Sequence, residues 1–323
     1  MKLAFTIATN NFIAQAKNVG DSYLQHNPGD RFIVFVFDKV IEEKGFDPVE
    51  VVEISPDWIP HFGEKLTRYL LFELITSLKP SIAKYCLDHY PGVSSYIFLD
   101  CDILVYHAFD AVDAALGGGA EIIISPHFLT PAPKDGCFPD EKTYFNCGIY
   151  NIGFFAYSEG TQSRLFLDWW ESRVEKECLL DFARGLFLEQ IWLNLAPLYF
   201  DRCILMKHPG YNVAYWNFHE RSLSLSGDGV YTINKNFPLV FFHFSGFNTS
   251  ERDMISRFQN RYTFGQKPEW RPLFDEYADK LIGSPYTRYS SLQCYYASLC
   301  KQPKKRSWLR RSLSRIKYAI IKT

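Results

Sequence analysis

The sequence has no organised pattern of cysteine. Its eight cysteines are scattered through 323 residues without a single C-x-x-C pair, so the usual spacing of a paired-cysteine metal or redox motif is missing. Cys101 and Cys147 lie inside apolar, strand-like runs. Because a free cysteine packs as a small apolar side chain, we interpret all eight as reduced core thiols of a cytosolic protein.

Long apolar runs are also missing. No stretch reaches the roughly eighteen residues that a membrane-spanning helix needs. Residues 1–10 carry one lysine, and their short apolar run fits a first buried strand better than the core of a secretory signal. We therefore expect neither a membrane span nor a secretory leader.

The common phosphate-binding and hydrolase motifs are absent as well. There is no G-x-x-x-x-G-K-[ST] loop, no G-x-G-x-x-G after the first strand and no H-E-x-x-H. Gly117-Gly118-Gly119 follows a helical stretch, which predicts a turn, and Ser125-Pro126-His127 is not a nucleophile elbow. These absences disfavour a P-loop enzyme, a dinucleotide-binding enzyme and a zinc protease.

Net charge is nearly zero, but its distribution is uneven. The chain has 35 Lys and Arg against 36 Asp and Glu, a formal charge of −1, so we expect no binding to nucleic acid through overall charge. Nine of the basic residues and no acidic residue fall in residues 301–323, which leaves residues 1–300 at −10. A basic tail on an acidic body indicates a partner of its own.

An apolar stripe accompanies this positive charge. If residues 301–323 form a helix, Leu309, Leu313, Ile316 and Ile320 fall on one face. A Lys/Arg-rich amphipathic helix is suited to the headgroup layer. We therefore predict that the tail docks on an anionic membrane surface, with the protein in the cytoplasm at the inner face of the membrane. The alternatives are packing of the stripe on the body and binding of the tail to nucleic acid, which the charge of −10 on residues 1–300 disfavours.

Apolar strands alternate with helical stretches over most of the chain. Several strands are apolar throughout, which is typical of a mostly parallel sheet covered by helices on both faces. The sequence thus predicts an α/β fold. The predicted strands cover residues 3–8, 31–37, 49–54, 96–99, 121–125, 144–156 and 239–243. The predicted helices cover residues 12–25, 62–90 with a break near Pro80, 162–177 and 187–195.

Residues 1–300 show no clean linker. We expect one catalytic domain over residues 1–250, a helical extension of the same domain over residues 251–300, and the basic amphipathic tail over residues 301–323.

Polar side chains follow three of the predicted strands. They are Thr9-Asn10-Asn11, Asp100-Cys101-Asp102, and His243 with Ser245 and Gly246. Ligands of such sheets bind at the carboxyl ends of the strands. His243 stands among aromatic residues, so a core position and a ligand role are both open.

The strongest local signal is Asp100-Cys101-Asp102 after the apolar run Tyr96–Leu99. Two carboxylates two residues apart can reach one cation only if the chain turns at the strand end. A pair flanked by apolar runs on both sides is costly without a partner. Hard divalent cations take such oxygen ligands, so the motif predicts a metal site.

Six segments in chain order resemble the GT-A glycosyltransferases, specifically glycosyltransferase family 8, which includes glycogenin and bacterial lipooligosaccharide galactosyltransferases. The resemblance covers roughly residues 1–250. The segments are Ala8-Thr9-Asn10-Asn11-Phe12, Leu99-Asp100-Cys101-Asp102, Tyr144-Phe145-Asn146-Cys147-Gly148, Leu188-Glu189-Gln190, Tyr211-Asn212 and Phe242-His243-Phe244-Ser245-Gly246.

The resemblance implies a Rossmann-like GT-A fold, a UDP-sugar donor and transfer of a hexose with retention of configuration. It implies that Asp100, Asp102 and His243 bind a metal, for which two carboxylates and an imidazole favour Mn²⁺ over Mg²⁺. Glu189 and Gln190 would lie beside the anomeric carbon. The remaining residues that we assign to the donor site are Thr9, Asn10, Asn11, Phe12, Lys79, Asp100, Cys101, Asn146, Gly148, Asn151 and Gly246.

Several of these assignments have plain structural alternatives. Phe12 could stack on uracil or be a core aromatic. Lys79 could reach the phosphates or be a solvated residue at a helix end. Glu189 and Gln190 could belong to an ordinary amphipathic helix. The aromatics of Tyr211–Trp216 could hold an acceptor sugar or serve packing.

The sequence also departs from the family pattern. Asn10 stands where the family has an acid, Phe12 where it has a tyrosine, and Glu189 where it has an aspartate. The family lysine after the H-x-x-G segment is missing, and Arg252, Arg257 or Arg261 are candidates to replace it.

The function indicated is a metal-dependent glycosyltransferase acting on a glycan or glycolipid acceptor, in keeping with surface polysaccharide synthesis. The alternatives are a nucleotidyltransferase, which would be expected to carry a basic Gly-rich loop after the first strand, and a non-catalytic carbohydrate-binding module. Hydrolysis of a sugar nucleotide separates an enzyme from the latter.

Overall fold

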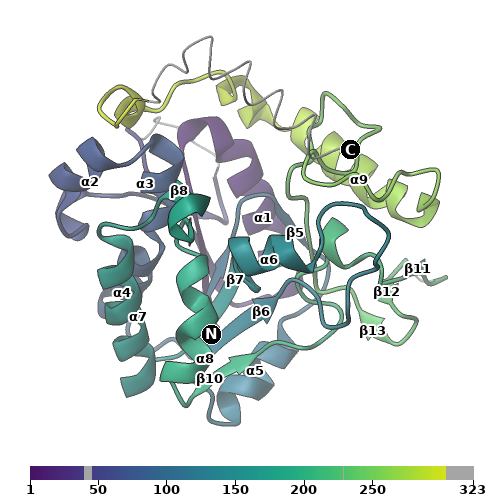
Figure 1. Cartoon of the computed structure of the whole chain (residues 1–323), viewed down its shortest axis with the longest axis horizontal. Helices are drawn as coiled ribbons and strands as arrows, with labels where there is room; N and C mark the ends of the chain where they lie inside the picture. Colours follow the sequence, from purple (N-terminus) through teal and green to yellow (C-terminus); the bar gives the residue numbers. More distant parts are fainter. Residues whose placement is uncertain (40–45, 228, 303–323) are drawn as a thin grey trace.

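The computed structural model of the chain describes residues 1–39, 46–227 and 229–302. Its centre is a seven-stranded sheet with helices on both faces (Figure 1). The strand order is β10 (Cys203–Leu205), β6 (Ile122–Pro126), β7 (Tyr150–Tyr157), β4 (Tyr96–Leu99), β1 (Leu3–Ala8), β2 (Arg31–Val36) and β3 (Glu50–Glu53).

Most neighbours in this sheet are parallel. β1 pairs in parallel with β2 and β4, β2 with β3, and β6 with β10, whereas β7 runs antiparallel to β4 and β6. The predicted mostly parallel α/β sheet is confirmed. Because β1 and β4 are parallel neighbours, the polar residues after both strands emerge at the same edge.

The alternation of side chains along β1 divides the core into two layers. Leu3, Phe5 and Ile7 pack into one apolar cluster, while Ala4 and Ala8 belong to the other. The helices α2 (Phe62–Arg68), α3 (Leu71–Ser77), α4 (Lys79–His89), α7 (Thr161–Val174) and α8 (Ala196–Tyr199) contribute to the first cluster, and α1 (Ile13–His26), α5 (Asp110–Gly117) and α9 (Arg271–Ile282) to the second.

Shorter elements surround the carboxyl edge of the sheet. β5 (Ile103–Val105) pairs antiparallel with β14 (Phe241–His243), which brings Ile103 opposite His243. The helix α6 (Glu141–Cys147) leads into β7. The remaining strands are the pair β8 (Leu180–Asp181) and β9 (Leu186–Phe187) and the small sheet of β11 (Leu223–Leu225), β12 (Tyr231–Ile233) and β13 (Phe237–Pro238).

Two local predictions were wrong. Residues 187–195 form no α-helix, because β9 ends at Phe187 and a 3₁₀ helix covers Ile191–Leu195. Residues 144–147 are the last turn of α6, which Gly148 ends with a φ of +107°, so the strand begins only at Tyr150. The predicted break near Pro80 is confirmed: α3 ends at Ser77 and α4 begins at Lys79. Pro80 thus lies in the first turn of α4, where its missing N–H costs no hydrogen bond.

The predicted tail, residues 301–323, lies outside the described residues except for Lys301 and Gln302. Residues 251–302 contain α9 and three short 3₁₀ helices, and loops connect them. Among the described residues, no helix is long and apolar enough to cross a membrane.

Candidate functional site

Asp100, Asp102 and His243 meet at the carboxyl edge of the sheet. The chain turns at Cys101 and Asp102, as the D-x-D motif requires, and Phe244 N–H donates to the Asp102 carbonyl at 2.8 Å. His243 Nε2 lies 2.9 Å from Asp102 Oδ1 and 4.0 Å from Asp100 Oδ2. One potential ligand atom from each residue lies within 4.8 Å of the others.

The imidazole of His243 is held in one orientation. Asn151 Oδ1 accepts hydrogen bonds from the Gly153 N–H and from His243 Nδ1, both at 3.2 Å. A side chain at position 153 would bring its Cβ within 2.8 Å of that Nδ1, so the close approach requires glycine. With Nδ1 engaged, Nε2 faces the two carboxylates.

The charges in this group are strongly coupled. Burial disfavours the charged imidazole, but the Asp102 carboxylate outweighs it and holds the pKa of His243 above its usual value. Burial likewise opposes ionisation of Asp102, yet the His243 imidazole holds that pKa below its usual value. Burial raises the pKa of Asp100 despite Lys79 and His243 nearby. A divalent cation would relieve the crowding of these carboxylates.

The residues therefore fit a metal. Two carboxylates, 32% and 36% exposed, and a buried imidazole with its second nitrogen engaged form the mixed oxygen and nitrogen donor set expected for such an ion. The set is the one predicted from the sequence.

Lys79 is buried at the start of α4 and its ammonium group is surrounded. Nζ lies 2.8 Å from Glu189 Oε1 and 3.3 Å from Asp100 Oδ1. It donates to the Ile152 carbonyl at 3.0 Å and lies 4.8 Å from the centre of the Phe98 ring. Burial lowers its pKa, but the two carboxylates outweigh burial and keep Lys79 protonated. Lys79 is thus an internal counter-ion, not a solvated helix-end lysine.

Glu189 and Gln190 occupy a loop after β9. The Glu189 side chain is 5% exposed, and its second oxygen, Oε2, has no hydrogen-bond partner among the described residues. Gln190 uses both ends of its amide on the backbone: Oε1 accepts from Ile152 N–H at 3.1 Å, and Nε2 donates to the Cys147 carbonyl at 2.8 Å. Gln190 thereby ties the turn at Gly148 to β7.

A largely apolar pocket of about 220 Å³ lies next to this charged group. Phe12 and Phe72 both line it and are 44% and 43% exposed, so Phe12 is not a core aromatic. Lys79 and Asp100 mark its charged end. The rest of its lining comes from Ile7, Ala8, Thr9, Ile75, Thr76, Phe98 and Cys101.

Sequence reasoning missed Phe72. It lies on α3, in a stretch that reads as an ordinary amphipathic helix, and carries no motif. Of the polar residues after β1, Asn10 is buried and donates its amide to the Lys39 carbonyl at 2.7 Å. Thr9 donates its hydroxyl to Asn11 Oδ1.

The other predicted residues fall in different places. Asn146 is exposed on α6, where its amide donates to the Lys142 carbonyl. Gly148 packs against Gln190, and Gly246 has a φ of +73°. Among the aromatics of residues 211–216, Tyr211 and Trp216 are buried, which supports the packing interpretation for them, whereas Tyr215 is partly exposed.

The three candidate arginines differ in their partners. Arg252 pairs with Asp279 at 2.7 Å, and Arg261 pairs with Asp135 at 2.8 Å. Arg257 is exposed and forms no ion pair with any described residue. Its backbone N–H donates to the Gly246 carbonyl at 3.1 Å, so it is fixed next to the strand end that carries His243.

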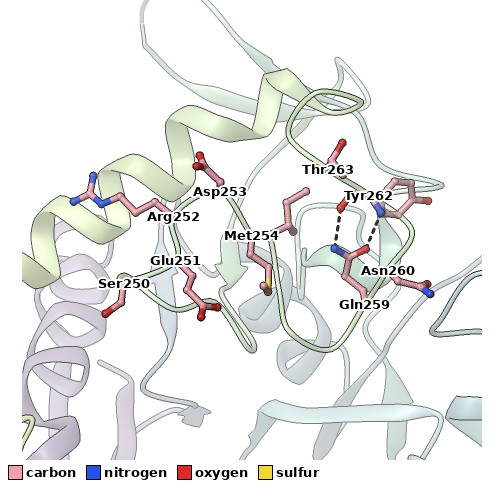
Figure 2. Close-up of a pocket in the computed structure, with 10 residues that line it drawn as sticks. Ser250, Glu251, Arg252, Asp253, Met254, Gln259, Asn260, Tyr262 and Thr263 are labelled. Atoms are coloured by element: carbon pink, nitrogen blue, oxygen red, sulfur yellow. Dashed lines mark hydrogen bonds between the residues drawn. The ribbon is translucent and has the colours of Figure 1, made fainter. Parts of the chain in front are cut away.

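A second pocket, of about 560 Å³, lies in the loop that precedes α9 (Figure 2). Its lining consists of residues 250–255, 259–260 and 262–263, and the Gln259 amide is hydrogen-bonded to the backbone of Tyr262. None of the metal-site residues lines this pocket. Its loop is joined to the strand end that carries His243 by Ser256, whose hydroxyl donates to the Ser245 carbonyl at 2.8 Å, and by the backbone of Arg257.

Comparison with known sequences gives little information about the function of this chain. No protein-family model matches the chain. A stretch of 100 residues is 31% identical to the uncharacterised protein YfnF of Bacillus subtilis (strain 168), covering 31% of this chain and 33% of that protein. The chain thus matches about a third of the length of this relative.

Solved structures give the fold. The chain is similar to the galactosyltransferase LgtC in complex with donor and acceptor sugar analogues, at 15% identity and a TM-score of 0.51, over 90% of this chain and 100% of that one; an active-site mutant of LgtC gives the same values. A glycosyltransferase involved in glycosylation of the major capsid of PBCV-1 aligns over 77% of this chain at a TM-score of 0.43 and 11% identity. The predicted GT-A fold is confirmed.

Proposed function

We propose that the chain is a metal-dependent, retaining glycosyltransferase of the family 8 type that transfers a hexose from a UDP-sugar to a glycan or glycolipid. The observation that carries the proposal is the adjacency of Asp100, Asp102 and His243 to the apolar pocket lined by Phe12 and Phe72. Such a pair of sites suits a ligand with a flat apolar base at one end and a diphosphate at the other.

The two parts of the site would bind the two ends of the donor. Phe12 and Phe72 would bind the faces of the uracil ring, and Asp100, Asp102 and His243 would hold the metal, Mn²⁺ in preference to Mg²⁺. When bound, a divalent cation neutralises negative charge on the departing diphosphate. Arg257 has no acidic partner among the described residues. It is the arginine that we assign to binding of the negatively charged diphosphate.

The sugar would lie between the metal and Glu189. Glu189 Oε2 is a buried acceptor without a hydrogen-bond partner among the described residues, as expected for a group that binds a sugar hydroxyl. Asn151, Gly148 and Gln190 form the adjacent wall. In the reaction, the bond between C1 and the phosphate oxygen breaks and a bond from C1 to the acceptor oxygen forms. The nucleoside diphosphate leaves and takes up the proton that the acceptor hydroxyl loses.

Lys79 has a supporting role in this scheme. Its three donors are engaged by Glu189, Asp100 and the Ile152 carbonyl, so it would position both carboxylates and would not contact the phosphates directly. This replaces our sequence-based assignment of Lys79 to the diphosphate.

Membrane association remains a proposal based on sequence. Residues 301–323 carry nine basic and no acidic residues, and we propose that they bind anionic lipid at the cytoplasmic face, where a lipid-linked acceptor of surface polysaccharide synthesis would be found.

A sugar-nucleotide hydrolysis assay tests the proposed function. UDP-glucose, UDP-galactose, UDP-GlcNAc and GDP-sugars are each incubated with the protein, with and without Mn²⁺. We expect release of UDP from one UDP-sugar that depends on Mn²⁺, and a loss on the order of 10³-fold in Asp102→Asn. Asp168→Asn, which changes an exposed ion pair on α7, is the matched control. Activity that survives a chelator, or that Asp102→Asn leaves intact, contradicts the proposal.

A further inference from the structure

Six large apolar side chains are exposed on the segments that carry Phe12 and Phe72 and on two segments that are hydrogen-bonded to them. Each is between 43% and 54% exposed. We call this set the apolar collar. It consists of Phe12, Phe72, Leu180, Phe182, Tyr295 and Leu299.

A shared pocket and three hydrogen bonds connect the segments that carry the collar. Phe12 and Phe72 line the same pocket. The Leu180 N–H donates to Glu73 Oε1 at 3.0 Å, which joins β8 to α3. On the other side, Asp38 accepts from the backbone N–H of both Asn10 and Tyr295, which joins the segment before Phe12 to the one before Leu299. Figure 1 shows α3, β8 and the yellow end of the described chain at the same part of the molecule.

The described chain ends at this surface. The Lys301 N–H donates to the carbonyls of Leu66 and Tyr69, both at 3.0 Å, at the junction of α2 and α3. The segment that continues from here, residues 303–323, carries eight of the nine basic residues of the tail and no acidic residue. The collar has a cation of its own, because Lys39 Nζ lies 4.2 Å above the centre of the Tyr295 ring.

We propose that the apolar collar is a membrane-docking surface whose partner is an anionic phospholipid bilayer. Exposed aromatic and aliphatic side chains that cluster on one surface mark an interaction site. Aromatic rings next to basic groups suit the layer between headgroups and acyl chains. The strongly positive segment that leaves from the same surface selects a negatively charged partner over a neutral one.

The proposal rests on the proposed function and adds the orientation of the enzyme. Because Phe12 and Phe72 belong to both the pocket and the collar, the donor site would open beside the bilayer. The acceptor would then be a glycan on a lipid carrier, presented at the height of the headgroups. Stable attachment of a protein to a membrane usually takes two weak contacts, and the collar and the tail would supply one each.

The test uses the full chain and two pairs of substitutions. Phe182→Glu with Leu299→Glu changes the collar and leaves the residues that line the pocket unaltered. Leu198→Glu with Leu225→Glu is the matched control, because these side chains are 76% and 58% exposed on α8 and β11, away from α2 and α3 (Figure 1). Both variants add the same negative charge.

Partition onto vesicles of phosphatidylglycerol and phosphatidylcholine is measured by flotation, and hydrolysis of UDP-sugar is measured without vesicles. We expect the collar variant to lose about tenfold in partition coefficient, since burial of one or two apolar side chains is removed, and the control variant to lose less than twofold. Both should keep the hydrolysis rate of the unchanged protein.

Three outcomes overturn the proposal. The collar variant floats as well as the control; both variants lose binding equally, which indicates a general charge effect; or light scattering shows that the unchanged protein is a dimer that the collar variant breaks, which assigns the surface to a second copy. If flotation behaves as expected but no sugar nucleotide is hydrolysed by any of the proteins, the docking surface stands and the proposed function fails.

Discussion

The two halves of the candidate site are built on opposite physical principles. The charged half is a chain of ion pairs that runs from Glu189 through Lys79, Asp100 and His243 to Asp102. Each of these residues depends on its neighbours in the chain to offset the cost of burial. In the aromatic half, Phe12 and Phe72 are close to half-exposed. Neither ring holds another side chain of the site in place.

This difference predicts different consequences of mutation. A buried ion pair that loses one member leaves a charge without compensation, so the damage extends to the fold. Truncation of a half-exposed ring removes only the contacts that this ring makes. The charged half should therefore be sensitive in both stability and activity, and the aromatic half in donor affinity alone.

The largest effect is expected for Lys79→Met, which would break the charged half at its centre. It leaves the Asp100 and Glu189 carboxylates without their cation, so the free energy of unfolding should fall by about 3–5 kcal/mol. Urea denaturation measures this. Lys84→Met is the matched control: Lys84 pairs with Asp168 and Glu171 but is 33% exposed, so its loss should cost at most about 1 kcal/mol. Equal losses in the two variants would contradict the difference between the halves.

The next largest effect concerns Gln190. Gln190→Ala removes the two hydrogen bonds that tie the turn at Gly148 to β7, which would displace the wall beside the sugar. We expect kcat to fall by about 10–100-fold, with a smaller change in the donor KM, because displaced groups matter most in the transition state. Steady-state kinetics of UDP-sugar hydrolysis measure both constants. Gln162→Ala on α7 is the control, and an unchanged kcat in Gln190→Ala would place this side chain outside the site.

A third prediction concerns the pH dependence of stability that His127 contributes. Its buried imidazole lies outside the charged half. Burial lowers the pKa of His127 to about 3, and its Nδ1 lies 3.0 Å from the Ile149 carbonyl. Since the folded-state pKa lies below the unfolded value of about 6.5, only the unfolded chain binds the proton between pH 6.5 and 3. Stability is therefore lost as the pH falls, by about 2 kcal/mol between pH 7.5 and 5.

Comparison with His127→Asn isolates this contribution, because His243, whose pKa is raised, titrates in the opposite sense in both proteins. Chemical denaturation at a series of pH values should give a difference in unfolding free energy between the two proteins that grows as the pH falls. A difference that does not change with pH would mean that folding leaves the pKa of His127 unshifted.

The smallest effect is expected in the aromatic half. Phe72→Ala should raise the dissociation constant of UDP about 5–10-fold, the loss of one ring contact of roughly 1–1.5 kcal/mol, and should leave the unfolding free energy nearly unchanged. Calorimetric titration of UDP with Mn²⁺ measures the binding. Phe145→Ala, at a ring that is 68% exposed on α6, is the control. A large loss of stability in Phe72→Ala would remove the distinction between the halves.

The sequence by itself was enough for the framework of the protein. Apolar runs such as Leu3–Ala8 and Tyr96–Leu99 are buried on both faces, so composition alone identifies them as strands of a mostly parallel sheet. The turn at Asp100-Cys101-Asp102 followed from the cost of burying two carboxylates that share no partner. Its distant partner His243 was assigned through the resemblance and from its place after an apolar strand.

Only the tertiary structure decided which residues the side chains of the site contact. Lys79 reads as a helix-end lysine. Only the approach of the end of β4 and of the loop after β9 surrounds it with Asp100 and Glu189. Phe72 carries no motif, and its role depends on the pocket that α3 forms with the end of β1. The amide of Gln190 could serve chemistry or structure, and it binds two backbone groups 38 and 43 residues away in sequence. A local sequence pattern indicates the secondary structure and the burial of its own residues. A contact between distant segments depends on how both segments pack, and no local pattern contains that information.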